Sequence, residues 1–338
     1  MQQRVVWVDY AKAIGIILVV YGHVARGLYH AGIGIPTYLY SIVDTVIYSF
    51  HMPLFFFLSG LFFYKSLKKQ GGKNLISSKV DTLIYPYLVW TILQGSLEAF
   101  LSDYTNGKVT YQEVLSLLWS PIAQFWFLYA LFFVYLFATI LFSISSKRLV
   151  LPVLLLSILL YLYPHALPDL LIFKFISHYF IYFTLGIVFS LNFTGDEISK
   201  YWVVFISAFA FVISQSICLV YGLNSSIANL ILSIIGILFV ISLSAWTSKF
   251  NFKIMILVGS ASLTIYLMHI LVTSGMRIFL VHSLGIHSVA SHLLFGCFAG
   301  IFLPVLAYML IEKYKIPYIL SAPINHWSAS ISKKISRV

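Results

Sequence analysis

Three residues with ionisable side chains lie in an apolar stretch near the start of the chain: Asp9, Lys12 and His23. A helix turns by about 100° per residue, so the spacing of Lys12 and His23 places them on one face within about 20°. Asp9 and Lys12 are three residues apart, a spacing at which opposite charges pair on a helix. The pattern predicts a polar stripe about 16 Å long. Ionisable groups inside lipid are costly, and by default they mark function.

His23 is the residue of this stripe best suited to proton transfer. Histidine titrates near neutral pH, and a neutral imidazole can accept a proton from a hydroxyl group as a general base. Two other interpretations stay open from the residues alone. A lone histidine in a membrane helix can be a structural hydrogen-bond partner, and Asp9 and Lys12 can be interfacial residues that extend toward the lipid headgroups.

The composition indicates what must position these residues. Of 338 residues, 61% are hydrophobic and only 9% are charged, whereas soluble domains carry about 25% charged residues. Lipid must therefore cover most of the exterior. The apolar runs are continuous and about 18 to 25 residues long, which favours membrane-spanning helices over the alternating strands of a barrel.

We predict an all-α integral membrane protein with about ten transmembrane helices. The spans are expected at residues 5–26, 38–64, 80–101, 124–143, 149–163, 171–191, 201–221, 227–246, 254–280 and 288–312. The fifth is short, and the second and ninth are long enough to tilt or break. Residues 1–315 are expected to form a single transmembrane domain, followed by a short basic tail at 316–338.

Loop charges predict the orientation of these helices. If the spans alternate, most of the 21 lysines and arginines fall on one side, which the positive-inside rule assigns to the cytoplasm together with both termini. Arg26, Lys108, Lys174 and Arg277 fall on the outer side. The net charge of +11 then reflects topology and contact with anionic lipid, so we expect no nucleic-acid partner. Cys218 and Cys297 lie in apolar runs without metal-ligand spacing, so we expect no metal and no bound cofactor.

Five segments together resemble the membrane acyltransferase 3 family across nearly the whole chain. Residues 9–23 match a first helix with a basic residue, ten further residues and a histidine. Residues 50–60, FHMPLFFFLSG, are similar to the branch that contains fucose 4-O-acetylase-like and other polysaccharide O-acetyltransferases. Three later segments, at 85–87, 125–128 and 262–269, resemble family segments in the expected order.

The resemblance implies transfer of an acyl group, usually acetyl, from cytoplasmic acetyl-CoA to a sugar hydroxyl. The acceptor is expected to be a cell-surface polysaccharide or its lipid-linked precursor, and the location a bacterial inner membrane, crossed several times. The oligomeric state stays open, with a homodimer among the possible states. The alternative from another class is a small-solute transporter of the same superfamily. A third interpretation is a structural subunit of a glycan assembly complex.

The resemblance also implies roles for the polar residues. His23 matches the family's essential histidine and is expected to be the general base, directly or through an acyl-histidine. Lys12 takes the place of the basic residue in the first helix, with Asp9 as its partner. His51 is a further catalytic candidate.

We expect separate groups to bind the donor and the acceptor. On the donor side these are Lys12, Lys79, Ser59 and Tyr266, and Ser59, Tyr266 and His51 are also candidates to stabilise the oxyanion. On the acceptor side they are Trp126, Tyr129 and His269, although the two aromatic residues also fit an interfacial belt.

One segment differs from the family. Relatives often carry two arginines three residues apart, where this chain has Lys79 and Thr82. Arginine grips phosphate with two hydrogen bonds, whereas lysine acts as a point charge.

The donor-side assignment predicts the effect of Lys12→Ala. Because Lys12 is expected to attract the anionic donor, this variant should weaken the use of acyl-CoA more than the use of the acceptor. The measurement is the dependence of the acylation rate on each substrate's concentration. An unchanged dependence on acyl-CoA would contradict the assignment.

Overall fold

The computed structural model describes residues 5–101, 109–143 and 149–322, and every regular element in these ranges is a helix. Eight segments are long and apolar enough to cross a membrane. They are Val6–His30, Thr37–Leu61, Tyr111–Phe142, Leu171–Asn192, Tyr201–Tyr221, Ser226–Phe250, Ser262–Ser283 and Val289–Tyr314. The predicted all-α membrane fold is therefore confirmed.

The two other predicted spans correspond to shorter helices. Residues 80–101 form the π-helical turn η1 (Val80–Ile84) and α5 (Tyr85–Phe100), which has 16 residues. The predicted span at 149–163 contains α8 (Val150–Leu162), with 13 residues. A helix of this length rises about 20 Å, less than the ~30 Å of a typical hydrocarbon core.

The chain divides into two compact units. The first comprises Met1–Ser59 and Val188–Met309, and the second Gly60–Ile187 and Leu310–Val338. Three helices pass from one unit into the other: α3 (His51–Leu61), α9 (Leu171–Asn192) and α15 (Val289–Tyr314).

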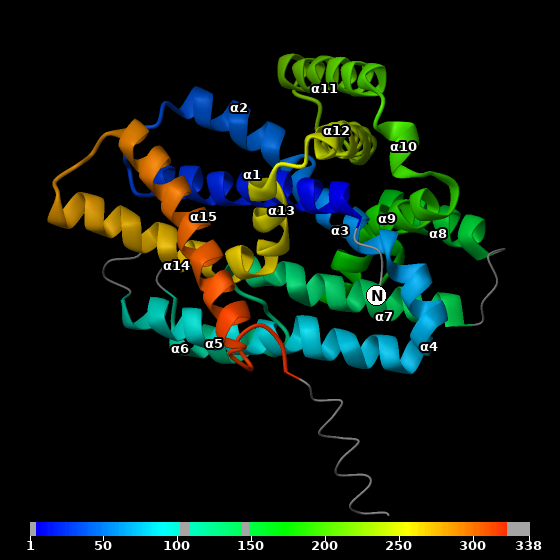
Figure 1. The fold of residues 1–338 in the computed structure, drawn as a ribbon, viewed down its shortest axis with the longest axis horizontal. Helices are drawn as coiled ribbons and strands as arrows, with labels where there is room; N and C mark the ends of the chain where they lie inside the picture. Colours follow the sequence, from blue (N-terminus) through cyan, green and yellow to red (C-terminus); the bar gives the residue numbers. More distant parts are fainter. Residues whose placement is uncertain (1–4, 102–108, 144–148, 323–338) are drawn as a thin grey trace, which may run out of the picture. The chain divides into compact units, whose positions relative to one another are not determined.

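Helix α1 (Val6–His30) is the buried element of the first unit. It packs against α2 (Thr37–Tyr48), α12 (Ser226–Thr247), α13 (Lys253–Ser260) and α14 (Ser262–Ile278). Helix α12 lies between α1 and α11 (Tyr201–Tyr221), as Figure 1 shows. Within the most apolar window of each helix, 67% of α1 but only 11% of α11 is buried. Helix α1 is thus enclosed by protein, whereas α11 presents most of its surface outward.

Both predicted spans that were long enough to break do break. The second divides between α2 and α3, and Pro53 lies in the first turn of α3, where its missing N–H needs no helical partner. The ninth divides at Ala261, between α13 and α14. These breaks start new helices beside α1 and change which side chains reach it.

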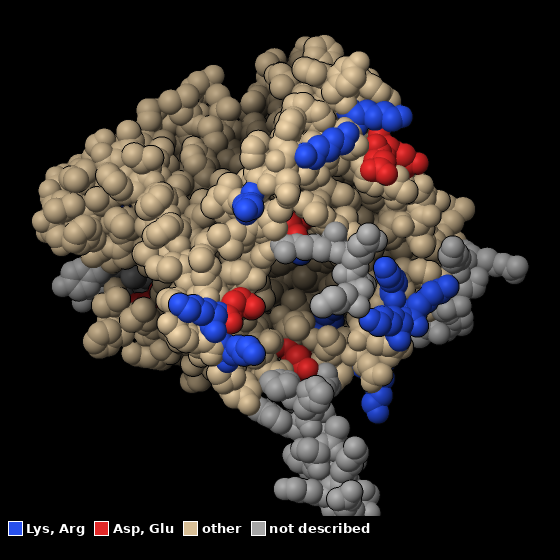
Figure 2. Space-filling view, viewed as in Figure 1, with Lys and Arg blue, Asp and Glu red and all other residues tan. Residues whose placement is uncertain are grey.

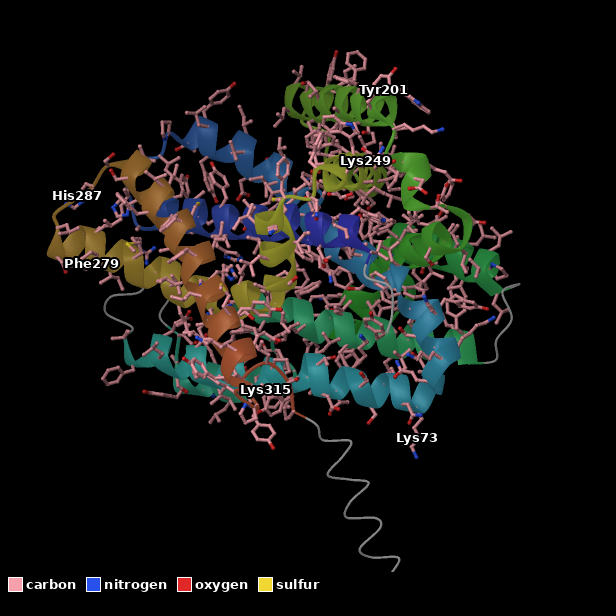
Figure 3. The ribbon with its side chains drawn as sticks, viewed as in Figure 1. Lys73, Tyr201, Lys249, Phe279, His287 and Lys315 are labelled. Atoms are coloured by element: carbon pink, nitrogen blue, oxygen red, sulfur yellow. The ribbon has the colours of Figure 1, made fainter. Side chains whose placement is uncertain are left out.

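The remaining elements of the first unit lie at helix ends. They are α10 (Gly195–Ile198), η6 (Ser248–Phe250) and η7 (Phe279–Ser283). After α12, the ammonium group of Lys249 donates a hydrogen bond of 2.9 Å to the carbonyl oxygen of Ser199, which lies just before Tyr201 and α11. Figure 3 shows Lys249 and Tyr201 at these adjoining helix ends.

The second unit is built around aromatic side chains. Its other helices are α4 (Phe63–Lys79), α6 (Tyr111–Leu115), η2 (Ser116–Leu118), η3 (Ala123–Phe125), α7 (Trp126–Ser143) and η5 (Pro164–Ala166). The buried ring of Phe63 contacts the rings of Tyr135, Phe142 and Phe183. Lipid-spanning helices of this unit therefore hold together through interlocking rings in the interior.

The predicted basic tail begins with residues that bond to α5. Trp90 donates through Nε1 to the carbonyl oxygen of Ile319 at 2.9 Å, and the Tyr85 hydroxyl donates to that of Tyr318 at the same distance. Residues 323–338 lie outside the described part of the chain.

Charged residues occupy a small part of the face shown in Figure 2, most of which is neither acidic nor basic. Several cations used to predict the orientation lie outside the described residues: Arg4, Lys108, Lys147, Arg148, Lys333, Lys334 and Arg337. The cytoplasmic location of the termini stays a prediction.

The contact between α1 and α13 predicts the effect of Gly259→Ala. A Cβ atom at this position would lie 2.0 Å from the carbonyl oxygen of Asp9, so α13 must move away from α1. We expect a loss of about 1–3 kcal/mol, seen as a lower melting temperature of the purified protein in detergent.

Gly275→Ala is the matched control, because no atom lies within 4 Å of the added Cβ in α14. Alanine favours a helix over glycine by up to about 1 kcal/mol, so this variant should melt at the same or a higher temperature. Equal melting temperatures for the two variants would contradict the close contact.

Candidate active site

His23 and His269 face each other in the first unit, one from α1 and the other from α14. Their ring centroids are 5.0 Å apart and their planes are inclined by 59°. His269 is fully buried, and its Nδ1 lies 2.8 Å from the carbonyl oxygen of Tyr266 and 3.0 Å from that of Ile265. A carbonyl oxygen only accepts, so we assign the proton to Nδ1. Nε2 then carries a lone pair, and it has no hydrogen-bond partner among the described residues.

A third histidine, His51, stands at the start of α3. Its Nδ1 donates to the carbonyl oxygen of Ile47 at 2.8 Å. Its ring centroid lies 4.4 Å from that of Tyr48, and the two rings are nearly perpendicular. His51 and His269 both interact electrostatically with His23. The break before α3 thus places a second histidine near the one that the sequence singled out.

An ion pair that the sequence analysis missed lies one turn beyond His23. Arg26 binds Asp44 through two hydrogen bonds, of 2.7 and 2.8 Å, and its guanidinium carbon lies 3.3 Å from the centre of the Tyr48 ring. Arg26 was predicted to end the first span on the outer side, but α1 continues to His30. The sequence offered one signal for this ion pair: Arg26 and Asp44 carry opposite charges in consecutive predicted spans. The pair ties α2 to α1 beside the histidines.

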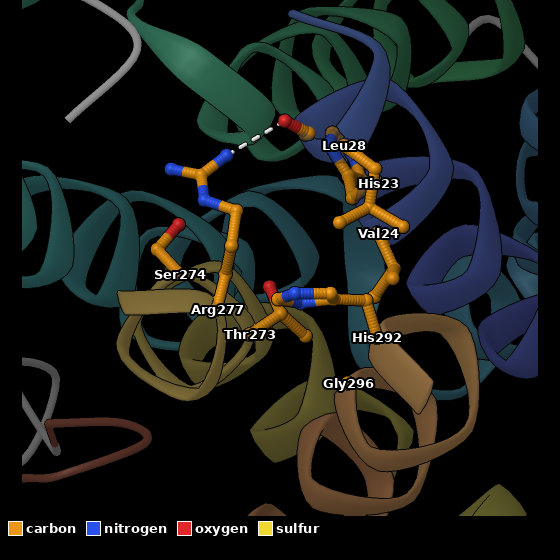
Figure 4. Close-up of a pocket in the computed structure, with 9 residues that line it drawn as sticks. His23, Val24, Leu28, Thr273, Ser274, Arg277, His292 and Gly296 are labelled. Carbon is orange, nitrogen blue, oxygen red and sulfur yellow. Dashed lines mark hydrogen bonds between the residues drawn. The ribbon is translucent and has the colours of Figure 1, made fainter. Parts of the chain in front are cut away.

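A small cavity of about 20 Å³ adjoins His23, room for about one water molecule. Figure 4 shows Arg277 and Thr273 of α14 and His292 of α15 around it. Arg277 donates through Nη1 to the carbonyl oxygen of Gly27 at 2.7 Å, and His292 donates through Nε2 to that of Ile286 at 2.9 Å. The cavity therefore brings together groups that hold and donate protons.

Sequence reasoning missed Arg277 and His292 as site residues. Arg277 was counted only as an outer-side cation but lies in the last turn of α14, and His292 is buried although it has no metal-ligand spacing. In the described part of the chain, no group of three or more histidines, cysteines and acidic residues is arranged to hold a metal ion.

The predicted donor-side residues of the first unit lie along α1 and its neighbours. A single helix carries Asp9, Lys12 and His23, so the predicted face is retained. The Ser59 hydroxyl donates to the carbonyl oxygen of Phe55 at 2.8 Å. Tyr266 is buried, with its ring centroid 6.3 Å from that of His269. The structure thus brings Tyr266 to the histidine pair.

Three other predicted residues belong to the second unit. The ammonium group of Lys79 lies 4.4 Å from the centre of the Tyr135 ring. Trp126 contacts the rings of Phe175 and Tyr179, and the buried Tyr129 donates its hydroxyl to the carbonyl oxygen of Leu118 at 3.0 Å. Their roles in binding stay predictions.

These features define a multi-pass helical membrane protein with titratable side chains gathered around one enclosed helix. The family model described as an acyltransferase domain matches residues 5–309. The chain belongs to this family, membrane acyltransferase 3, as the sequence motifs indicated.

Two curated relatives share part of the sequence. Nodulation protein NolL of Mesorhizobium japonicum is 29% identical over 124 residues, which cover 37% of this chain and 32% of the relative. The protein of the same name from Sinorhizobium fredii is 29% identical over 126 residues, which cover 36% of this chain and 32% of the relative. The matched part of the chain thus spans about a third of the length of each relative. No solved structure matches this chain.

The Arg26–Asp44 pair predicts the effect of Asp44→Asn. The side chains of Arg26 and Asp44 are 37% and 22% exposed, so the variant leaves a half-buried cation without its carboxylate. We expect a loss of about 1–2 kcal/mol, between the costs for surface and buried pairs. The measurement is the shift in thermal unfolding in detergent.

Asp169→Asn is the control, because its pair with Lys174 is 86% and 64% exposed. Water and salt screen such a pair, so its removal should not change the unfolding temperature measurably. Equal shifts in the two variants would show that the Arg26–Asp44 pair does not stabilise the contact between α1 and α2.

Proposed function

We propose that the protein transfers an acetyl group from cytoplasmic acetyl-CoA to a sugar hydroxyl of a surface polysaccharide or its lipid-linked precursor. The observation that carries this proposal is the His23–His269 pair beside a small cavity on an enclosed helix. The segment at 50–60, which resembles polysaccharide O-acetyltransferases, supports the acceptor class. The protein acts in a bacterial inner membrane with both termini in the cytoplasm.

His23 acts as the general base in the proposed reaction. It removes the proton of the sugar hydroxyl while the hydroxyl oxygen attacks the carbonyl carbon of the thioester. A C–O bond forms, and the carbonyl oxygen carries the negative charge of the tetrahedral intermediate. The C–S bond then breaks, and the CoA thiolate accepts the proton from His23. No oxidant or reductant is needed.

His269 positions His23 and stabilises its protonated form. Its Nδ1 is held by backbone carbonyls, which fixes the ring and leaves Nε2 as an acceptor beside His23. Protonated His23 carries an additional N–H that this acceptor can bind. Such orientation of a base by a second group is common in acyl-transfer sites.

The donor approaches from the end of α1 that carries Lys12. Lys12 lies three helical turns from His23, about 16 Å along the same face, and Asp9 lies within pairing distance in sequence. A cation at that end suits the phosphates of CoA, while the pantetheine arm follows the face toward His23. The acceptor then meets the thioester from the opposite direction.

The oxyanion candidates differ in what their hydrogens already bind. The Ser59 hydroxyl and Nδ1 of His51 donate to carbonyls of Phe55 and Ile47. Either bond must break before the same hydrogen stabilises an oxyanion. Tyr266 is the third candidate, with its ring centroid 6.3 Å from that of His269.

His23→Gln tests the proposal. Loss of the base should lower acetyl transfer by about 10²- to 10⁴-fold, because general base catalysis typically contributes that much. The measurement is transfer of labelled acetyl groups from acetyl-CoA to glycan by the full-length protein in membranes, with expression and melting temperature checked in parallel.

His287→Gln is the matched control, since His287 is exposed in the loop before α15, where Figure 3 labels it. It should transfer acetyl groups like the wild type. Undiminished transfer by His23→Gln would remove the central assignment. A wild-type protein that moves a solute but never consumes acetyl-CoA would favour the transporter alternative.

A further inference from the structure

Arg277 is a membrane-helix cation without an acidic partner in the described ranges of the chain. It is half-buried in α14 and lines the cavity that holds His23. A guanidinium group has five N–H donors, and the hydrogen bond found for Arg277 uses Nη1, toward the carbonyl oxygen of Gly27 (Figure 4). Most of its donors and its whole charge are left for another group.

Arg26 shows how this chain compensates a cation at a similar position. It lies one turn from His23, and it has a carboxylate with two hydrogen bonds and an aromatic ring. Among the described residues, the hydrogen bond of Arg277 goes to one neutral carbonyl instead. A cation enclosed in a membrane protein is costly without a counter-charge. The contrast indicates that the counter-charge of Arg277 comes from a ligand.

The Ser274 hydroxyl and the His292 ring line the same cavity as Arg277. Ser274 is three residues earlier on α14, a spacing that places both side chains on one face. His292 contributes a ring from α15. A volume of about 20 Å³ accepts one small group but not a sugar ring. The cavity therefore fits a single anionic group, such as a phosphate or carboxylate, while the rest of the ligand lies outside it.

The position along α1 distinguishes the two substrates. Gly27, which Arg277 contacts, follows His23 by one turn, whereas Lys12 precedes it by three turns on the same helix. If the donor enters from the Lys12 end, Arg277 lies on the acceptor side of the base. The two cations would then attract two different anions.

We propose that Arg277 binds an oxyanion of the acceptor, a phosphate or carboxylate group near the sugar hydroxyl that receives the acetyl group. This inference rests on the proposed function and adds the acceptor's charge to it. Arginine suits the task because its planar donors bind phosphate and carboxylate through two parallel hydrogen bonds. The anion pairs with Arg277 and holds the hydroxyl next to His23.

Binding to the full-length protein in detergent, measured by calorimetry, tests the site without requiring turnover. The probes are two matched pairs: a short-chain isoprenyl phosphate with its alcohol, and the methyl glycosides of glucuronic acid and glucose. Wild type should bind at least one anionic probe more tightly than its neutral partner. Arg277→Gln should weaken that binding by about tenfold or more and leave the neutral probes unchanged. Whichever anion depends on Arg277 identifies phosphate or carboxylate as the group.

Two variants control for folding and for net charge. Arg277→Lys keeps the charge but loses the planar pair of donors, so it should bind the anion with intermediate affinity. Lys174→Gln removes one exposed positive charge from the start of α9 and should bind like the wild type. If Lys174→Gln weakened anion binding as much as Arg277→Gln, the loss would reflect net charge alone, and the proposed site would be wrong.

The donor is tested in the same experiment. Arg277→Gln should bind acetyl-CoA like the wild type. A tenfold loss of acetyl-CoA affinity, with anionic probes unaffected, would assign the cation to the donor and overturn the proposal. So would a wild type that binds neither anion better than its neutral partner.

The two proposals fail in different ways. A wild type that transfers no acetyl group, yet binds an anion through Arg277, contradicts the proposed function and leaves the anion site standing. Normal acetyl transfer together with anion binding that ignores Arg277 contradicts the site alone.

Discussion

Lipid provides no hydrogen bonds, and this constraint governs where the polar groups of α1 can lie. Each must find a partner within the protein or face a cavity. Helix α1 is accordingly enclosed by α2, α12, α13 and α14, while α11 on the outside is almost wholly apolar. Tyr10 bonds to the backbone of Phe252, Arg26 to Asp44, and His23 meets His269. His23 is therefore held among the same helices that supply partners to the polar residues near it on α1.

Enclosure this tight depends on small residues where helices cross. Gly259 brings α13 onto the backbone of α1, and Gly22 accommodates the Tyr48 ring, whose atoms would lie 3.0 Å from an added Cβ. Gly300 of α15 gives room to Thr273 of α14 and to Val20 of α1. The cavity beside His23 is also small, with a volume of about 20 Å³. In the proposed reaction, so small a space leaves little room for water to compete with the sugar hydroxyl for the thioester.

Periodicity was enough to predict the common face of Lys12 and His23, and run length showed that the second and ninth spans could tilt or break, because both depend on local geometry. The positions of the breaks, before His51 and at Ala261, were not predicted. The pairing of His23 with His269 could not be predicted, since it depends on how α14 packs on α1. Arg26 and Arg277 lie near the outer ends of their predicted spans and were counted only as signals of orientation, because a charge normally marks the end of an apolar run. In the structure, Asp44 offsets the first charge within the protein, and the second contacts the carbonyl of Gly27. The length of an apolar run shows where a charge would be costly in lipid. It does not show which residue of another helix will pair with that charge.

His23 forms no ion pair with a carboxylate in the described residues, and this bears on how the proposed reaction ends. In many hydrolases a carboxylate beside the base stabilises the imidazolium. Here the ring beside His23 is that of His269, whose Nε2 can accept a hydrogen bond from protonated His23 but carries no negative charge. The proton must therefore leave quickly, and the CoA thiolate is the strongest acceptor at hand in that scheme. In the proposed reaction, His23 therefore keeps the proton of the sugar hydroxyl only for a short time. Deprotonation of the sugar and departure of CoA then follow each other closely.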